Sequence, residues 1–271
     1  MELTLFQAFV LGALQGLAEF LPVSSSAHLA LAPWAFGWPE PGLAFDVALY
    51  VGSLAALLWY FRAEWVALVR AAWSIVVTRR VETIEQRRAI LLIIATIPGG
   101  IAGLLLEKKA ETAFRAPALT AAALIVMGAV LWIVDARASR NKKIESFTNL
   151  DALLVGCAQA VALIPGVSRS GATITAGRAL GFDRESAATF SFLMSMPIIA
   201  AAAILKVPKA LAQGGVTLPL AVAVITAAVS SAFAINILLR FVKYRGLGVF
   251  ALYRFALGAA VLALVAYRAH S

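Results

Sequence analysis

Apolar residues dominate this 271-residue chain and occur in long runs that short polar segments separate. A helix needs about 20 mainly apolar residues to cross a bilayer. The stretches that reach this length are 42–61, 88–106, 116–134, 185–206, 216–239 and 247–268. The pattern therefore predicts about six transmembrane helices. Residues 64–77 are apolar but carry Glu64 and Arg70, which favours an interfacial or short packed helix.

Two further segments, residues 3–36 and 150–180, are too long for one span and too short for two. A polar break interrupts each: residues 19–28 in the first and residues 165–173 in the second. Irregular backbone at membrane depth is tolerated only where it is buried in protein or lines a wet cavity. Each segment is therefore predicted to be a re-entrant helical hairpin, made of two short helices that meet at the break.

The two hairpins resemble each other at a fixed offset of 144 residues. We interpret the chain as a single integral membrane domain, 1–271, with a first repeat at about 1–134 and a second at about 150–268. The polar and glycine matches are Gly12 with Gly156, Gln15 with Gln159, Ser24 with Ser168, and Ser26 with Ser170.

Composition agrees with a membrane protein, because only 14% of the residues are charged and 62% are hydrophobic. A soluble domain carries about 25% charged residues. The mean hydropathy is +0.90. Cys157 is the only cysteine, which excludes a disulfide scaffold.

The net charge of +9 is divided unevenly between the two predicted sides of the membrane. Fifteen Lys and Arg residues fall on one side and six on the other. Cytoplasmic loops of membrane proteins carry an excess of Lys and Arg. This rule explains the asymmetry without a nucleic-acid partner. The first hairpin then enters from outside and the second from the cytoplasm. The predicted fold is an all-α polytopic membrane protein with an inverted-topology repeat.

The polar breaks have the chemistry of an anion site. In broken-helix repeats, ligands bind where half-helices meet, with positive N-terminal ends aimed at anions. The breaks offer serine hydroxyls that can cap the helix N-termini, glycine that lets the backbone approach a ligand closely, and the guanidinium of an arginine. These groups together favour a phosphate-type anion. The residues expected to bind substrate are Gln15, Ser24, Ser26, Gly166, Ser168 and Ser170, and Arg169 is expected to be catalytic.

Glu19, Ser25 and His28 are expected beside the anion site. A hydroxyl, an imidazole and a carboxylate are the parts of an activated nucleophile with its base. His28 attacking phosphorus itself is the alternative. Glu19 and Gln15, which are one turn apart, offer oxygens that would instead hold Mg²⁺ or Ca²⁺. A carboxylate at membrane depth indicates function by default.

Two other charged residues at membrane depth stay open at this stage. Asp46 is either a helix cap or a site residue, and Arg254 either reaches the membrane surface or pairs with Asp46 or another carboxylate. The patterns Gly12-x-x-x-Gly16 and Gly99-x-x-x-Gly103 predict close helix packing.

The segment QGLAEFLPVSSSAH at residues 15–28 resembles the (E/Q)xxxE and PVSSxxH signatures of the undecaprenyl-pyrophosphate phosphatase, or bacitracin-resistance, family. PGVSRSGAT at 165–173 resembles its PGxSRSxxT signature. Weaker matches elsewhere extend the resemblance to nearly the full length of the chain. The chain has Gln15 where many members have Glu, and Asp46 where a Glu is frequent.

The resemblance implies a phosphatase of the bacterial inner membrane that recycles the lipid carrier of cell-wall synthesis and gives bacitracin resistance. The substrate would be a polyisoprenoid pyrophosphate, with membrane lipids around the protein and the active site open to the outer, periplasmic face. The family pattern adds Thr173 to the pyrophosphate-binding loop, and gives Ser25 and His28 the nucleophile and acid/base positions. Whether the protein forms a homodimer is left undecided by the sequence. The alternative function is a lipid-phosphate flippase or transporter, because inverted repeats with broken helices are also a transporter architecture.

Overall fold

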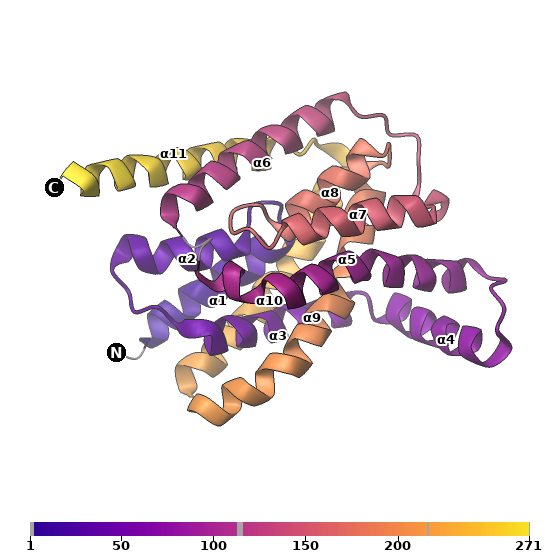
Figure 1. The fold of residues 1–271 in the computed structure, drawn as a ribbon, viewed down its shortest axis with the longest axis horizontal. Helices are drawn as coiled ribbons and strands as arrows, with labels where there is room; N and C mark the ends of the chain where they lie inside the picture. The colour runs from indigo at the N-terminus through magenta and orange to yellow at the C-terminus, as the bar shows by residue number, and fades with distance from the viewer. Residues whose placement is uncertain (1–2, 113–115, 216, 271) are drawn as a thin grey trace.

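The computed structural model describes residues 3–112, 116–215 and 217–270, and these form helices joined by short loops (Figure 1). All six predicted spans lie in helices. The helices are α1 (Leu5–Phe20), α2 (Ser25–Phe36), α3 (Gly42–Tyr60), α4 (Arg62–Thr78), α5 (Ile84–Thr112), α6 (Pro117–Arg137), the 3₁₀ turn η1 (Ile144–Ser146), α7 (Asn149–Val161), α8 (Arg169–Ala179), α9 (Arg184–Gly214), α10 (Leu218–Tyr244) and α11 (Gly248–His270).

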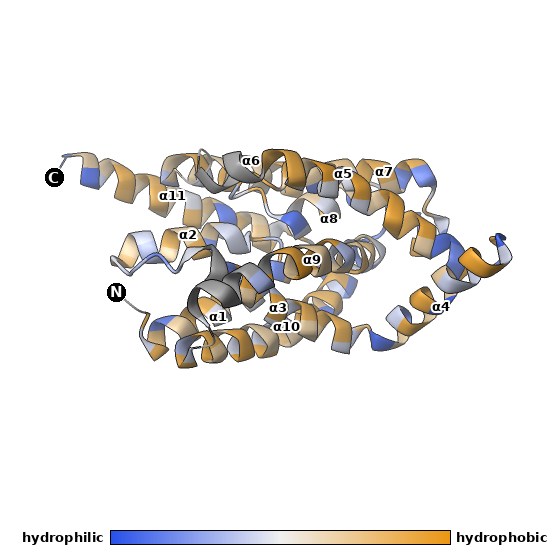
Figure 2. Cartoon of the chain, turned by 60° about the horizontal axis from the view of Figure 1, so that its bottom comes forward, coloured by the Kyte–Doolittle hydropathy of each residue, from blue (hydrophilic) through white to orange (hydrophobic). Residues whose placement is uncertain are grey.

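Within the described chain, five helices are long and apolar enough to cross a membrane: α5, α6, α9, α10 and α11. A sixth span comes from α3, which bends by 86° into α4 at Phe61. Hydrophobic residues colour most of the length of these helices, while hydrophilic ones gather at helix ends, including both ends of α4 (Figure 2). The protein is a multi-pass membrane protein.

Each predicted hairpin is a pair of helices joined by a short non-helical break. The first pair is α1 and α2, and the second is α7 and α8. The first pair begins and ends at the end of the molecule that holds both termini, and the second pair at the opposite end (Figure 1). This arrangement is consistent with an inverted repeat, while re-entry into a membrane stays a prediction.

The local geometry of the two pairs repeats at the 144-residue offset. Thr4 is the N-cap residue of α1 and Thr148 that of α7, each with a capping box in which side chains and backbone N–H groups bond reciprocally. Ser24 and Ser168 precede α2 and α8, with positive φ angles of 77° and 72°. Two non-glycine residues in this strained region at equivalent positions indicate that the turn geometry is functionally constrained.

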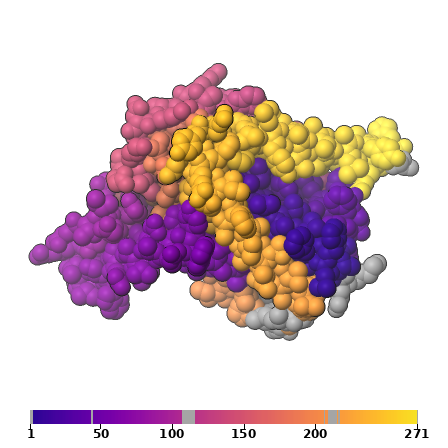
Figure 3. Space-filling view, turned by 180° about the vertical axis from the view of Figure 1, so that it is seen from behind, coloured from indigo at the N-terminus to yellow at the C-terminus, as the bar shows by residue number. Residues whose placement is uncertain are grey.

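Glycines let the two repeats interlock. A Cβ on Gly12 of α1 would lie 2.4 Å from the carbonyl oxygen of Ala223 in α10. A Cβ on Gly156 of α7 would lie 2.4 Å from the carbonyl oxygen of Ala95 in α5. Each hairpin therefore packs closely on a helix of the other repeat. Figure 3 shows α10, in light orange, against the indigo N-terminal helix.

The expected packing of the two glycine patterns is confirmed in part. Gly16 follows Gly12 in contact with α10, where its Cβ would lie 2.4 Å from the carbonyl oxygen of Ala227. Gly99 lies against a side chain of α7. The prediction for Gly103 is wrong, because a Cβ there would meet no described atom within 4 Å.

A buried carboxylate links three helices and the loop between α10 and α11 at the end of the molecule opposite the termini. Asp135 of α6 accepts from Arg178 Nε at 2.9 Å and from Arg184 Nε at 2.8 Å. It also accepts from the backbone N–H of Leu247 at 2.9 Å. Arg178 and Arg184 are among the fifteen basic residues that the sequence assigns to the cytoplasmic side. Their hydrogen bonds to Asp135 connect α8 and α9 to α6. Of the six basic residues assigned to the other side, Arg115 lies outside the described residues.

Candidate active site

The carboxylate of Glu19 is the centre of the site. Glu19 lies in the last turn of α1, and its side chain is only 4% exposed. Its Oε2 accepts a hydrogen bond from Ser25 Oγ at 2.5 Å and one from Gln15 Nε2 at 3.0 Å. Its Oε1 forms an ion pair with Arg169 Nη2. The structure therefore brings together four of the residues that the sequence singled out.

The repeat explains why Ser25 and Arg169 meet at one carboxylate. Ser25 is the first residue of α2 and Arg169 the first residue of α8. They are 144 residues apart, so they occupy equivalent positions of the two pairs. One repeat contributes a hydroxyl and the other a guanidinium, and both approach Glu19 from helix N-termini. A helix N-terminus favours negative charge.

The serines beside these residues cap the two helices. Ser168 Oγ accepts from the N–H of Gly171 at 3.1 Å and lies 3.2 Å from Ser170 Oγ. Ser24 Oγ lies 3.2 Å from Ser26 Oγ in the same way. Ser170 Oγ also donates to a carbonyl of the first break, at Leu21, over 3.1 Å. Direct binding of substrate by these hydroxyls stays a prediction.

Thr173 and Gly166 belong to the scaffold of the second break. The hydroxyl of Thr173 donates to the carbonyl of Arg169 at 2.8 Å and lies 2.6 Å from Ser191 Oγ of α9. Gly166 has a φ of 95°, and a Cβ there would lie 2.5 Å from the carbonyl oxygen of Thr120. Glycine is therefore required at this turn, both for its φ and for space.

Both ring nitrogens of His28 have partners other than Glu19. Its Nδ1 lies 2.7 Å from the carbonyl oxygen of Ser24, which can only accept, so Nδ1 carries a proton. Its Nε2 lies 2.6 Å from the hydroxyl of Tyr253, and the two rings stack 5.7 Å apart. In the neutral tautomer Nε2 accepts from that hydroxyl. The geometry thus pairs Ser25 directly with Glu19, without His28 between them, and sequence reasoning missed Tyr253.

Arg254 joins the two breaks. It is fully buried and donates from Nη1 to the carbonyl of Pro22 at 3.2 Å and from Nη2 to the carbonyl of Gly166 at 2.6 Å. The expectation that it reaches the membrane surface is wrong, and in the described residues its hydrogen bonds go to backbone carbonyls instead of a carboxylate. Asp46 lies half-buried in the first turns of α3.

A cavity of about 210 Å³ opens onto this cluster. Its wall is polar near the two breaks and apolar along α9. The lining residues are Glu19, Ser25, Ser26, Tyr50, Gly99, Gln159, Ala162, Leu163, Ser168, Arg169, Ile198, Ile199 and Ala202. His28 is not among them. A pocket with convergent polar groups on an apolar wall suits an amphiphilic ligand.

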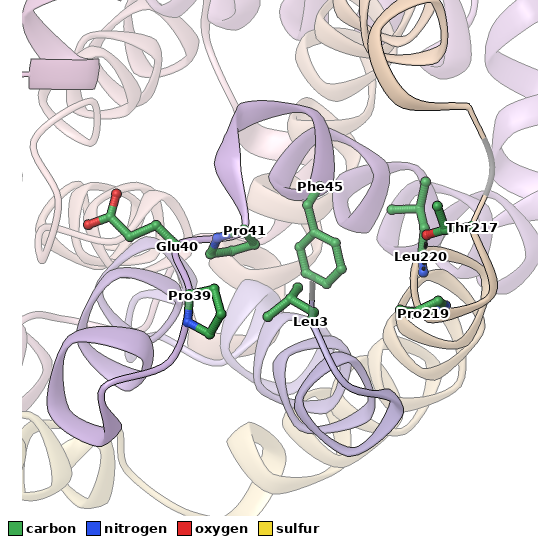
Figure 4. A pocket seen from close by; sticks show the side chains of 8 residues that line it. All are labelled: Leu3, Pro39, Glu40, Pro41, Phe45, Thr217, Pro219 and Leu220. Atoms are coloured by element: carbon green, nitrogen blue, oxygen red, sulfur yellow. Dashed lines mark hydrogen bonds between the residues drawn. The ribbon is translucent and has the colours of Figure 1, made fainter. Parts of the chain in front are cut away.

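A second hollow, of about 190 Å³, lies where α3 and α10 begin (Figure 4). Phe45, Leu3 and Leu220 gather at its centre, and the carboxylate of Glu40 points away from them. Its lining residues include no basic side chain, and their one charged group is the carboxylate of Glu40, which an anion would avoid. The cavity at Glu19 is therefore the candidate active site.

The chain is similar to a known protein family over most of its length. Residues 8–260 match the protein family described as bacitracin resistance protein BacA. The chain is 59% identical to an undecaprenyl-diphosphatase of Gemmatimonas aurantiaca, over 98% of this chain and all of that protein. It is 47% identical to an undecaprenyl-diphosphatase of Pelotomaculum thermopropionicum, over 98% of each chain.

Proposed function

This chain belongs to the family of bacitracin resistance protein BacA, and from that membership we infer that it is an undecaprenyl-diphosphatase. It hydrolyses undecaprenyl pyrophosphate to undecaprenyl phosphate and inorganic phosphate, which returns the lipid carrier to cell-wall synthesis. The assignment of the site rests on the carboxylate of Glu19, which contacts both Ser25 and Arg169 at the N-termini of α2 and α8.

Ser25 is our proposed nucleophile. Its Oγ attacks the terminal phosphorus while its proton passes to Glu19 Oε2, which already accepts from it at 2.5 Å. The bond from that phosphorus to the bridging oxygen breaks, and undecaprenyl phosphate leaves. Water then cleaves the phosphoserine and releases inorganic phosphate. Direct contact between Ser25 and Glu19, together with the place of His28 outside the cavity lining, supports Ser25 over His28 as nucleophile.

Arg169 and the two helix N-termini would stabilise the phosphoryl group during transfer. Charge spreads over the three equatorial oxygens of the transferred group, so positioning and electrostatic stabilisation supply most of the catalysis. Substrate phosphate would compete with Glu19 for the guanidinium of Arg169, whose side chain is 19% exposed. The apolar wall formed by Ile198, Ile199 and Ala202 would receive the first part of the isoprenoid tail.

The experiment that tests this function measures phosphate release from undecaprenyl pyrophosphate by the purified protein in detergent. Rapid release by the wild type, with a large loss in Arg169→Ala, is expected. Unchanged release in Arg169→Ala would contradict the assigned site. Absence of release from any lipid pyrophosphate would contradict the function and favour the flippase or transporter.

A divalent cation, Mg²⁺ or Ca²⁺, is a further proposal at this site. Glu19 and Gln15 would hold it, because Gln15 Oε1 is buried with no hydrogen-bond partner among the described residues and oxygen ligands suit both ions. The described residues hold no group of three His, Cys, Asp or Glu side chains, so substrate phosphate oxygens would complete the coordination. The ion would neutralise charge on the diphosphate.

Chelation tests this proposal. Phosphate release is expected to fall after treatment with EDTA and to recover when Mg²⁺ or Ca²⁺ is added back. A second measurement uses Gln15→Leu, which lacks the unpaired Oε1. This variant should need a higher cation concentration than the wild type for half-maximal phosphate release. Activity that EDTA leaves unchanged would contradict a metal at this site.

We further propose that the protein resides in the bacterial inner membrane with its active site open to the periplasm. The support is the excess of basic residues on loops at one end of the molecule. Arg80→Cys and Lys108→Cys, each in a Cys157→Ala background, test the orientation by labelling with an impermeant thiol reagent in intact cells. Position 108 should label and position 80 should label only after permeabilisation. The reverse pattern would contradict the proposed orientation.

A further inference from the structure

Gln159 is a buried amide with no hydrogen-bond partner in the described part of the chain. It lies in the last turn of α7 and is only 4% exposed. Both its Oε1 and its Nε2 lack a partner there. Leaving a buried polar group unpaired costs folding free energy, so such groups are rare and call for an explanation. Gln159 also lines the cavity that holds Glu19 and Arg169.

The equivalent residue of the first repeat does have a partner. Gln15, 144 residues earlier, donates from Nε2 to Glu19 Oε2 at 3.0 Å. The position equivalent to Glu19 in the second repeat is Leu163, which cannot accept a hydrogen bond and lines the same cavity. The second repeat thus keeps the amide but lacks the carboxylate that would pair with it. Since no described residue supplies an acceptor for Gln159 Nε2, a bound ligand can supply it.

The helix beside Gln159 leaves space for this amide. A Cβ on Gly99 of α5 would lie only 2.5 Å from Gln159 Nε2 and 3.1 Å from its Cγ. Gly99 itself lines the cavity. Glycine at position 99 therefore lets the side chain of Gln159 lie along α5 with its amide at the cavity wall.

We infer that Gln159 binds the diphosphate group of the substrate, with its Nε2 donating to a phosphate oxygen in the cavity shared with Arg169. Phosphate oxygens are acceptors, and an amide nitrogen offers two donors. The inference rests on the proposed function and adds a second-repeat residue to the substrate site. The unpaired amide in the free protein is then a stability cost that substrate binding removes.

Gln159→Leu tests this inference through two opposite effects. Hydrogen bonds to charged groups change affinities by about 10- to 100-fold, so KM for undecaprenyl pyrophosphate should rise by about that factor with kcat little changed. The melting temperature without ligand should stay level or rise, because an unpaired buried amide is replaced by an apolar side chain. A structural role alone would lower the melting temperature and leave KM unchanged, which would overturn the inference.

Two glycines of α5 provide a matched pair. Gly99→Ala should raise KM, because its new methyl group displaces the amide of Gln159. Gly103→Ala, on the same helix and with open space around its Cβ, should keep the wild-type KM. Equal KM values in the two variants would count against a binding role for the amide.

Ligand binding without turnover separates this inference from the proposed function. A farnesyl diphosphate analogue with a methylene bridge between its phosphorus atoms should raise the melting temperature of the wild type more than that of Gln159→Leu. A wild type that hydrolyses undecaprenyl pyrophosphate while Gln159→Leu keeps its KM and its thermal shift refutes the role of Gln159 alone. A wild type that neither hydrolyses the lipid nor responds to the analogue refutes the function itself.

Discussion

Glu19→Gln is expected to lower kcat/KM for undecaprenyl pyrophosphate by about 10²- to 10⁴-fold, the usual contribution of a general base. Gln keeps the size of Glu but cannot take the proton of Ser25, which now donates to Oε2 at 2.5 Å. It also leaves Arg169 without its anionic partner. The loss should appear mainly in kcat, because the proton moves only during the chemical step.

Glu185→Gln is the matched control for this change. Glu185 also forms an ion pair, at 2.9 Å to Lys243 Nζ, but both side chains are about half exposed and lie outside the candidate site. Exposed ion pairs contribute little, so both activity and stability should stay near wild-type values. Wild-type kcat/KM in Glu19→Gln would contradict the role of Glu19, whatever the control shows.

Arg254→Lys is expected to destabilise the protein by about 3–5 kcal/mol, because it loses about two hydrogen bonds from a buried charged group, each contributing about 1.5–3 kcal/mol. The guanidinium is fully buried and bonds to Pro22 of the first break and to Gly166 and Val167 of the second. Its Nε donates to Leu124 of α6. An ammonium lacks the planar fork that reaches all of these carbonyls at once. Thermal unfolding in detergent measures the loss, and phosphate release should fall with it.

Arg268→Lys is the control on the same helix. Arg268 donates to the carbonyls of Trp34 and Ala35, each at 3.0 Å, but it is exposed. Its replacement should cost less than about 1 kcal/mol. An Arg254→Lys protein as stable as Arg268→Lys would show that the two breaks hold together without Arg254.

The sequence predicted the parts of this site that neighbouring residues determine. Two polar breaks in apolar segments identified the helix pairs, and the motif spacing placed Glu19, Ser25 and Arg169 together. Charge at membrane depth is expensive, so those few residues stood out against an apolar background. For these residues, the local sequence pattern and the free-energy cost of burying charge in a membrane were sufficient for the prediction.

What the sequence did not predict depends on contacts between distant segments. Arg254 is 232 residues from Pro22, and its carbonyl partners carry no sequence signal. The pairing of His28 with Tyr253 spans 225 residues. Gln159 was visible only as a match to Gln15, because the absence of a partner is a property of packing. Each of these features follows from how the repeats interlock, which hydrophobic periodicity alone does not specify.

The central claim is that Ser25, activated by Glu19, carries out phosphoryl transfer at the meeting point of the two repeats. Its most direct test is the rate of phosphate release from undecaprenyl pyrophosphate by purified Ser25→Ala protein with a wild-type melting temperature. The account predicts a loss of at least about 10³-fold, because the variant lacks the hydroxyl that donates to Glu19 Oε2 and attacks phosphorus. A rate within about tenfold of the wild type would contradict it.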